Sequence, residues 1–153
     1  MTGRTIIALA VFLTLVASAG GAEDRKAIFA ELSRIAIEKM WGNAVGLDGK
    51  PLQPKNDKER TTIPITPEHA EYVILSAAVV GQAMWCGLDW NADYLRYMQI
   101  ERKRHSPTTT QVAYIGFLFG LSQQQFAKAF AMGGKCTDQD RSKVQHDLKA
   151  LGR

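Results

Sequence analysis

One apolar stretch constrains the fold of this chain more than any other part. It runs from Thr66 to Trp90 and reads TPEHAEYVILSAAVVGQAMWCGLDW. Within Tyr72–Cys86, only Ser76 and Gln82 interrupt a series of apolar and small residues. A helix that is apolar on all sides is either buried or embedded in a membrane. Because the run has about 15 residues and a bilayer span needs about 20, we expect a buried central helix.

The ends of this helix carry recognisable boundary signals. Thr66 can cap the first turn with its side chain, and Pro67 suits the first helical position, where no hydrogen-bond donor is lost. Gly87 is expected to end the helix in a left-handed conformation. The sequence therefore predicts a helix from about Pro67 to Cys86.

Small residues predict where other helices approach closely. Four lie within the central helix: Ala77, Ala78, Gly81 and Ala83. Gly116 and Gly120, four residues apart in a later helical segment, are expected to form a second groove for close packing.

The first 19 residues have the three-part layout of a secretory signal peptide. Arg4 precedes the apolar run Ile6–Ala17, and Ala17-Ser18-Ala19 is a small-x-small cleavage pattern. We expect cleavage after Ala19 or Ala22, a mature domain of residues 20–153, and a periplasmic or secreted location. The alternative is an uncleaved membrane anchor, for which the run is short. No stable transmembrane segment is expected in the mature chain.

The two cysteines, Cys86 and Cys136, are expected to form a disulfide, because disulfides persist in exported proteins. Two free thiols are the alternative. A bridge closing a loop of about 50 residues is worth ~4 kcal/mol in the chain-entropy description. There is no C-x-x-C motif, which argues against thioredoxin-like redox chemistry and c-type haem attachment.

Four further segments have apolar residues at spacings of three and four, which is typical of amphipathic helices. They are Glu23–Trp41, Ala92–Lys103, a segment from Ser106-Pro107 to about Met132, and one that begins at Thr137. The predicted fold class is therefore all-α: a small single-domain bundle of about five helices, stapled by one disulfide. In the third helix, Tyr94, Leu95 and Met98 are expected to face the core, with Tyr97 less squarely placed.

A long polar loop is expected at about residues 43–65, because this stretch has neither helical nor strand periodicity. The pair Asp48-Gly49 predicts a tight turn within a small hairpin. Loops of this length are usually functional or disordered, and the sequence leaves open whether this one is a functional loop or a mobile linker.

Candidate ligand-facing residues lie at the two exposed ends of the central helix: Glu68, His69 and Glu71 at one end, and Asp89, Trp90 and Asp93 at the other. The carboxylates have an ordinary alternative role as helix-capping groups. Trp90 and Trp85 bracket Cys86, where they either pack on the disulfide as part of the core or line an aromatic groove.

The sequence predicts no metal site, no cofactor and no assignable catalytic residue. The histidines His69, His105 and His146 have no metal-ligand partner three or four residues away, and no H-E-x-x-H motif occurs. No G-x-S-x-G motif and no glycine-rich phosphate loop are present either.

The densest charge cluster is a possible anion patch of four residues: Arg102, Lys103, Arg104 and His105. Its alternative is a solvated helix end, where positive charge is favourable. The net charge of +4 permits weak attraction to anionic surfaces. An exported protein has little access to nucleic acid, so no nucleic-acid partner is expected.

The chain is similar to the small periplasmic acid-stress chaperones of the HdeA kind. The shared features are export, helical class and, from about Cys86 onward, a single disulfide between well-separated cysteines. The resemblance implies a chaperone that exposes apolar surface in acid. Our leading hypothesis from the residues is a non-enzymatic exported protein that binds another protein or an envelope component. A third hypothesis is a small cell-wall hydrolase built around Glu68 or Asp89.

Overall fold

The protein folds as an all-α domain, as predicted. The structure, a computed structural model, describes residues 21–46, 48–105 and 107–151. Its helices are α2 (Ala22–Met40), α3 (Asp57–Thr61), α4 (Pro67–Trp85), α5 (Asn91–His105), α6 (Thr109–Gly133) and α7 (Asp138–Ala150). The predicted signal peptide, residues 1–19, lies outside the described residues. None of the described helices has the length and hydrophobicity that a membrane crossing requires.

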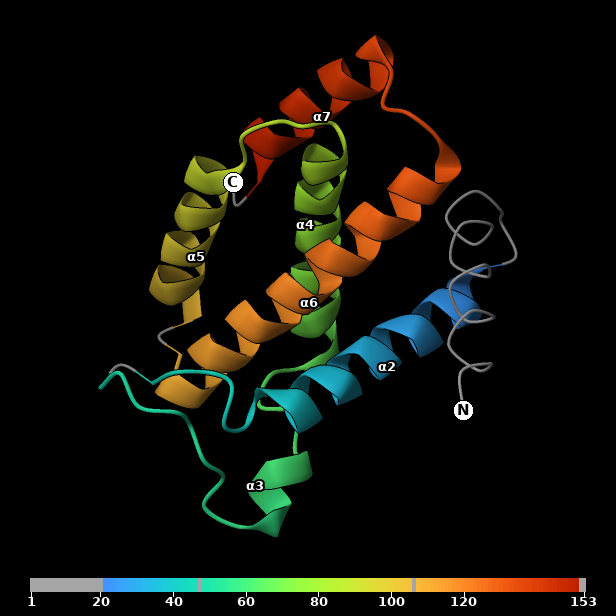
Figure 1. Cartoon of the computed structure of the whole chain (residues 1–153). Helices are drawn as coiled ribbons and strands as arrows, with labels where there is room; N and C mark the ends of the chain where they lie inside the picture. The colour runs from blue at the N-terminus through green and yellow to red at the C-terminus, as the bar shows by residue number, and fades with distance from the viewer. Residues whose placement is uncertain (1–20, 47, 106, 152–153) are drawn as a thin grey trace.

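Helices α4 and α6 cross at the centre, and the other helices surround this crossing (Figure 1). Helix α2 packs along α6, α5 stands on the opposite side, and α7 lies across the far end of α4. The predicted ends of α4 are confirmed. The Thr66 hydroxyl accepts a hydrogen bond from the backbone N–H of His69, and Gly87 takes a φ of 65°.

The crossing is close because Gly81 has no side chain. A Cβ atom at this position would lie 2.8 Å from the Gln123 carbonyl oxygen and 2.8 Å from the Phe126 Cβ atom. These distances are shorter than real Cβ contacts, so the backbone of α6 would have to move. The predicted second groove is wrong: a Cβ atom at Gly120 would have nothing within 4 Å, and one at Gly116 would meet only ordinary contacts.

Helix α4 is buried on most sides but not all, which corrects the expectation of complete burial. Val73, Ala77 and Val80 are inaccessible to solvent. Tyr72 and Leu75, by contrast, are exposed. The reason is that α6 and α7 together cover only part of the α4 surface, which leaves an apolar strip of α4 open beside the end of α7.

Helix α5 faces the core with Tyr94 and Met98, as predicted, but the predictions for Leu95 and Tyr97 need correction. Leu95, predicted to be internal, is 60% exposed, whereas Tyr97 is completely buried. The Tyr97 ring packs against Phe119 of α6 at a centroid distance of 5.1 Å. Aromatic packing against α6 therefore sets the rotation of α5 about its own axis. The weak amphipathic pattern of the sequence did not predict this rotation.

Helix α6 begins later than the predicted Ser106-Pro107 start. Thr108 is its cap: its hydroxyl accepts from the Gln111 N–H, and the Gln111 side chain accepts from the Thr108 N–H. This reciprocal pair is a capping box, which satisfies two N–H groups that a helix start leaves open. Ser106 itself lies outside the described residues.

The predicted polar loop at 43–65 contains regular structure. The predicted small hairpin is present as a single antiparallel bridge between Val45 and Pro51. The charged run then forms the short helix α3, whose cap is Asn56, which accepts from the Glu59 N–H. A five-residue helix is too short to show a helical period in the sequence, so the pattern predicted a loop here.

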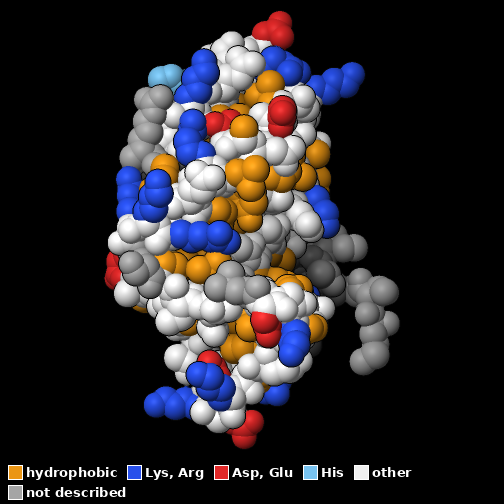
Figure 2. All heavy atoms as spheres, turned by 90° about the vertical axis from the view of Figure 1, so that its left-hand side faces the viewer, with side chains coloured by type: hydrophobic (Ala, Val, Ile, Leu, Met, Phe, Trp, Pro, Cys, Tyr) orange, Lys and Arg blue, Asp and Glu red, His pale blue; other side chains and the backbone are white. Residues whose placement is uncertain are grey.

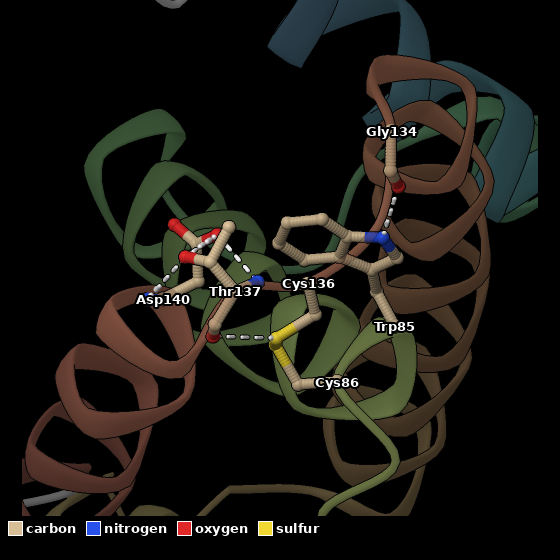
Figure 3. The surroundings of a disulfide bond; sticks show 6 residues. All are labelled: Trp85, Cys86, Gly134, Cys136, Thr137 and Asp140. Atoms are coloured by element: carbon tan, nitrogen blue, oxygen red, sulfur yellow. Dashed lines mark hydrogen bonds between the residues drawn. A yellow bond between two sulfur atoms is a disulfide. The ribbon is translucent and has the colours of Figure 1, made fainter.

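The disulfide between Cys86 and Cys136 is present and joins the end of α4 to the segment before α7 (Figure 3). Beside it, the Trp85 indole N–H donates to the Gly134 carbonyl, and Thr137 and Asp140 form the predicted cap of α7. Hydrogen bonding to Thr137 lowers the pKa of Asp140. The bridge thus holds the start of a helix that buries only a thin apolar stripe, Val144 and Leu148.

Gly81→Ala is expected to lower the free energy of unfolding by about 1–3 kcal/mol, because the added methyl group overpacks the crossing. Gly120→Ala is the matched control, because it makes the same chemical change in a helix where space is available. It should leave stability unchanged or raise it by up to ~1 kcal/mol through helix propensity. Urea unfolding followed by circular dichroism measures both, and equal effects would contradict the close crossing.

Candidate functional site

A concavity lies between α2 and the start of α4. We call it the α2–α4 groove, and its volume is about 630 Å³. It is lined by Lys26, Phe29, Ala30 and Ser33 from α2, Ile63 and Ile65 from the preceding segment, and Pro67, Glu68, Ala70 and Glu71 from α4. Its lining is mostly apolar, with charged side chains added from both helices.

An extended segment, Thr62–Thr66, forms one wall of this groove, and we call it the strap. It is fixed at several points. The Gln111 side-chain amide donates to the Pro64 carbonyl at 2.8 Å, and the Thr62 hydroxyl donates to the Lys58 carbonyl at 2.6 Å. The strap is therefore a preformed wall whose position is set by α3 and α6.

A second concavity of about 530 Å³ lies on the other side of the strap. We call it the His69 pocket. Its walls are the strap itself, His69 of α4, and Pro107, Gln111 and Ile115 at the start of α6. Ile63 and Ile65 line both concavities, and Ile63 is the more exposed of the two, at 36%.

His69, which lines this pocket, also forms a buried pair with Glu101. His69 Nε2 lies 2.5 Å from Glu101 Oε2 of α5, and the two side chains are only 16% and 2% exposed. The other carboxylate oxygen, Oε1, has no hydrogen-bond partner among the described residues. Burying a carboxylate is costly unless it is paired, so His69 stabilises Glu101 and thereby joins α4 to α5.

Two buried tyrosines lie in this part of the molecule, Tyr97 beside Glu101 and Tyr114 beneath the α2–α4 groove. Burial raises the pKa of Tyr97 far above its usual range, and the neighbouring Glu101 carboxylate adds to the effect. Burial likewise raises the pKa of Tyr114 to about 12. The Tyr114 hydroxyl donates to the Ser33 carbonyl at 3.1 Å, which links α6 to α2 beneath the groove.

Glu68 and Glu71 lie on the α4 wall of the α2–α4 groove. Neither carboxylate forms an ion pair with any residue in the described ranges, and the same holds for Lys26 on the α2 wall. Glu68 is in the first turn of α4, where the helix dipole favours negative charge. The groove therefore has an acidic wall and a single basic residue opposite.

The residues at the other end of α4 serve local structure. Asp89 accepts a hydrogen bond from the Asn91 N–H, and Asp93 pairs with Arg96 at 2.7 Å. Trp90 packs edge-on against Tyr94, with ring centroids 6.1 Å apart. Trp85 instead stacks on Phe130 of α6, so the two tryptophans do not line one shared groove.

Arg102, Lys103 and Arg104 are exposed at the C-terminal end of α5, and the side chain of His105 lies outside the described residues. Figure 2 views the molecule from the α5 side and shows Lys and Arg side chains spread over this face among apolar ones. In the described ranges, no three His, Cys, Asp or Glu side chains gather as the ligands of a metal ion would.

The structure thus brings Glu68, His69 and Glu71 to two adjoining concavities. Of the other seven candidates, the six whose side chains are described lie outside both: Asp89, Trp90, Asp93, Arg102, Lys103 and Arg104. Sequence reasoning missed Glu101 and Ile63. Glu101 directly precedes the basic cluster Arg102–His105, and its spacing of four from the buried Tyr97 puts both on one face of a helix. Comparison with protein-family models, curated proteins and solved structures found no match.

His69→Ala is expected to lower the free energy of unfolding by about 3 kcal/mol, because it leaves the buried Glu101 carboxylate without its partner. Glu101→Gln should cost less, since a neutral amide needs no counter-charge. Chemical denaturation of both variants and of the double variant gives the coupling energy.

Lys143→Ala is the matched control for this measurement. It breaks a 2.6 Å pair with Asp147 whose lysine is 68% exposed, so its expected cost is below about 1 kcal/mol. If His69→Ala cost no more than Lys143→Ala, the buried pair would have no special part in stability.

Proposed function

We propose that this chain is an exported, non-enzymatic protein that binds another protein or an envelope component through the α2–α4 groove. The observation that supports this proposal is the groove itself, an apolar concavity of about 630 Å³ on a scaffold fixed by a disulfide. Binding sites are usually preformed concavities with apolar walls and a few well-placed polar groups. The signal-like N-terminal sequence and the disulfide support a periplasmic or secreted location.

The arrangement of the carboxylates gives little support to the hydrolase hypothesis. Glu68 lies in the first turn of α4 and Asp89 beyond its last residue, Trp85. The helix alone separates Glu68 from Trp85 by about 26 Å, at 1.5 Å per residue over 17 residues. Glycoside hydrolases use two carboxyl groups about 5–10 Å apart. Glu68 and Asp89 therefore do not form such a pair.

The proposal is tested by retrieving partners from the envelope fraction of the source cells with an affinity-tagged protein. Ile63→Asp places a charge between the two concavities and is expected to abolish retrieval of any groove-bound partner. Leu95→Asp is the matched control, because Leu95 is equally apolar, is 60% exposed on α5 and lies outside the groove lining. Partners retained equally by both variants would contradict groove binding.

A second candidate function, an acid-stress chaperone, is favoured by the buried His69–Glu101 pair. Strong acid protonates carboxylates in general, and a contact between α4 and α5 that depends on a carboxylate would weaken. The apolar surface between α5 and α6, including Tyr97 and Phe119, would then become accessible.

The chaperone candidate predicts that the fluorescence of a hydrophobic dye rises when the protein is taken from pH 7 to pH 2. Glu101→Gln should bind the dye more at pH 7 than the unmodified protein does, because it mimics the uncharged carboxyl group. The exposed pair variant Asp147→Asn is the control and should not. No rise on acidification would exclude the chaperone candidate.

A further inference from the structure

The charges of the α2–α4 groove differ in sign from the charge of the whole molecule. The chain carries a net charge of +4, yet two of the three charged side chains that line the groove are the carboxylates of Glu68 and Glu71. Neither is neutralised by an ion pair with a described residue. An anionic lipid surface or an acidic peptide would be repelled from this wall.

The apolar part of the groove defines where a partner can insert. Phe29 is nearly buried at its base, and Ala30 and Ile63 are exposed on its sides. Because the strap is held by hydrogen bonds from α6 and α3, this space needs no rearrangement before binding. A side chain such as Leu or Phe fits such a base, and burial of its apolar surface would supply most of the affinity.

Lys26 gives the groove a direction. It lies on the α2 wall, opposite the carboxylates of the α4 wall, so a basic group of a partner is favoured on one side and repelled on the other. A partner with one basic side chain therefore has one preferred orientation in the groove.

From these observations we infer that the groove binds a protein segment in which an apolar side chain adjoins a Lys or Arg. The apolar side chain packs against Phe29 and Ile63, and the basic side chain pairs with Glu68 and Glu71. This inference rests on the proposed function, since it specifies the chemistry of the partner at the same groove. A single groove of this size fits a small contact area, which is typical of transient recognition.

The test uses fluorescein-labelled ten-residue peptides in a Gly/Ser background, measured by fluorescence anisotropy with the purified protein expressed from its full coding sequence. Four peptides combine either Leu or Ser with either Lys or Glu. The Leu/Lys peptide is expected to bind most tightly, and its affinity should fall as salt is raised.

Glu68→Gln combined with Glu71→Gln is expected to weaken the Leu/Lys peptide about tenfold and to leave the Leu/Glu peptide unchanged or tighter. Both side chains lie outside the core, so the variant should fold, with a small loss of stability from the missing charge in the first turn of α4. Lys26→Gln should strengthen the Leu/Lys peptide. A Leu/Glu peptide that binds as tightly as Leu/Lys, or a double variant without effect, would overturn the inference.

Ile63→Ser separates failure of this inference from failure of the proposed function. If the Leu peptides bind without charge preference and Ile63→Ser abolishes their binding, the groove is a binding site and only its charge selectivity is wrong. Met132→Ser is the control, at an exposed apolar residue on α6. If neither Ile63→Ser nor Met132→Ser changes peptide binding, groove binding itself is wrong.

Discussion

The close crossing of α4 and α6 is the contact on which the rest of the structure depends. At Gly81 the backbones approach so closely that no Cβ atom fits between them. This contact fixes α6 over the middle of α4, and α6 then positions α2 through Tyr114 and α5 through Phe119. A close-packed interior transmits such a constraint because its side chains have little room to adjust.

The disulfide acts at the other end of α4, where packing is weaker. Helix α7 buries only a thin apolar stripe, Val144 and Leu148. A helix of this kind is marginal alone, and the bond at Cys136 holds its start against the end of α4. Trp85 reinforces the same corner by stacking on Phe130 and by donating to the Gly134 carbonyl. The disulfide and the Trp85 contacts therefore hold together an end of the molecule where α7 buries few apolar side chains.

At the N-terminal end of α4 the chain uses a different means of holding helices together. The buried pair of His69 and Glu101 joins α4 to α5, and the strap joins α3 to α6 across the same region. Because the strap stands between α2 and α6, it leaves a concavity on each side. The α2–α4 groove and the His69 pocket thus form because the strap keeps the helices on its two sides apart.

The sequence by itself determined the helical class, the ends of α4, the cap of α7 and the pairing of Cys86 with Cys136, because caps, glycine stops and a single pair of cysteines are local or combinatorial signals. Only the tertiary structure decided which side chains of α5 are most buried. Tyr97 rather than Leu95 turned inward because Phe119 offered an aromatic surface, and Glu101 was buried because His69, 32 residues earlier, could balance its charge. The close approach occurs at Gly81 and not at Gly116 or Gly120 because of where another helix passes. The spacing of glycines along one helix carries no information about the path of another helix.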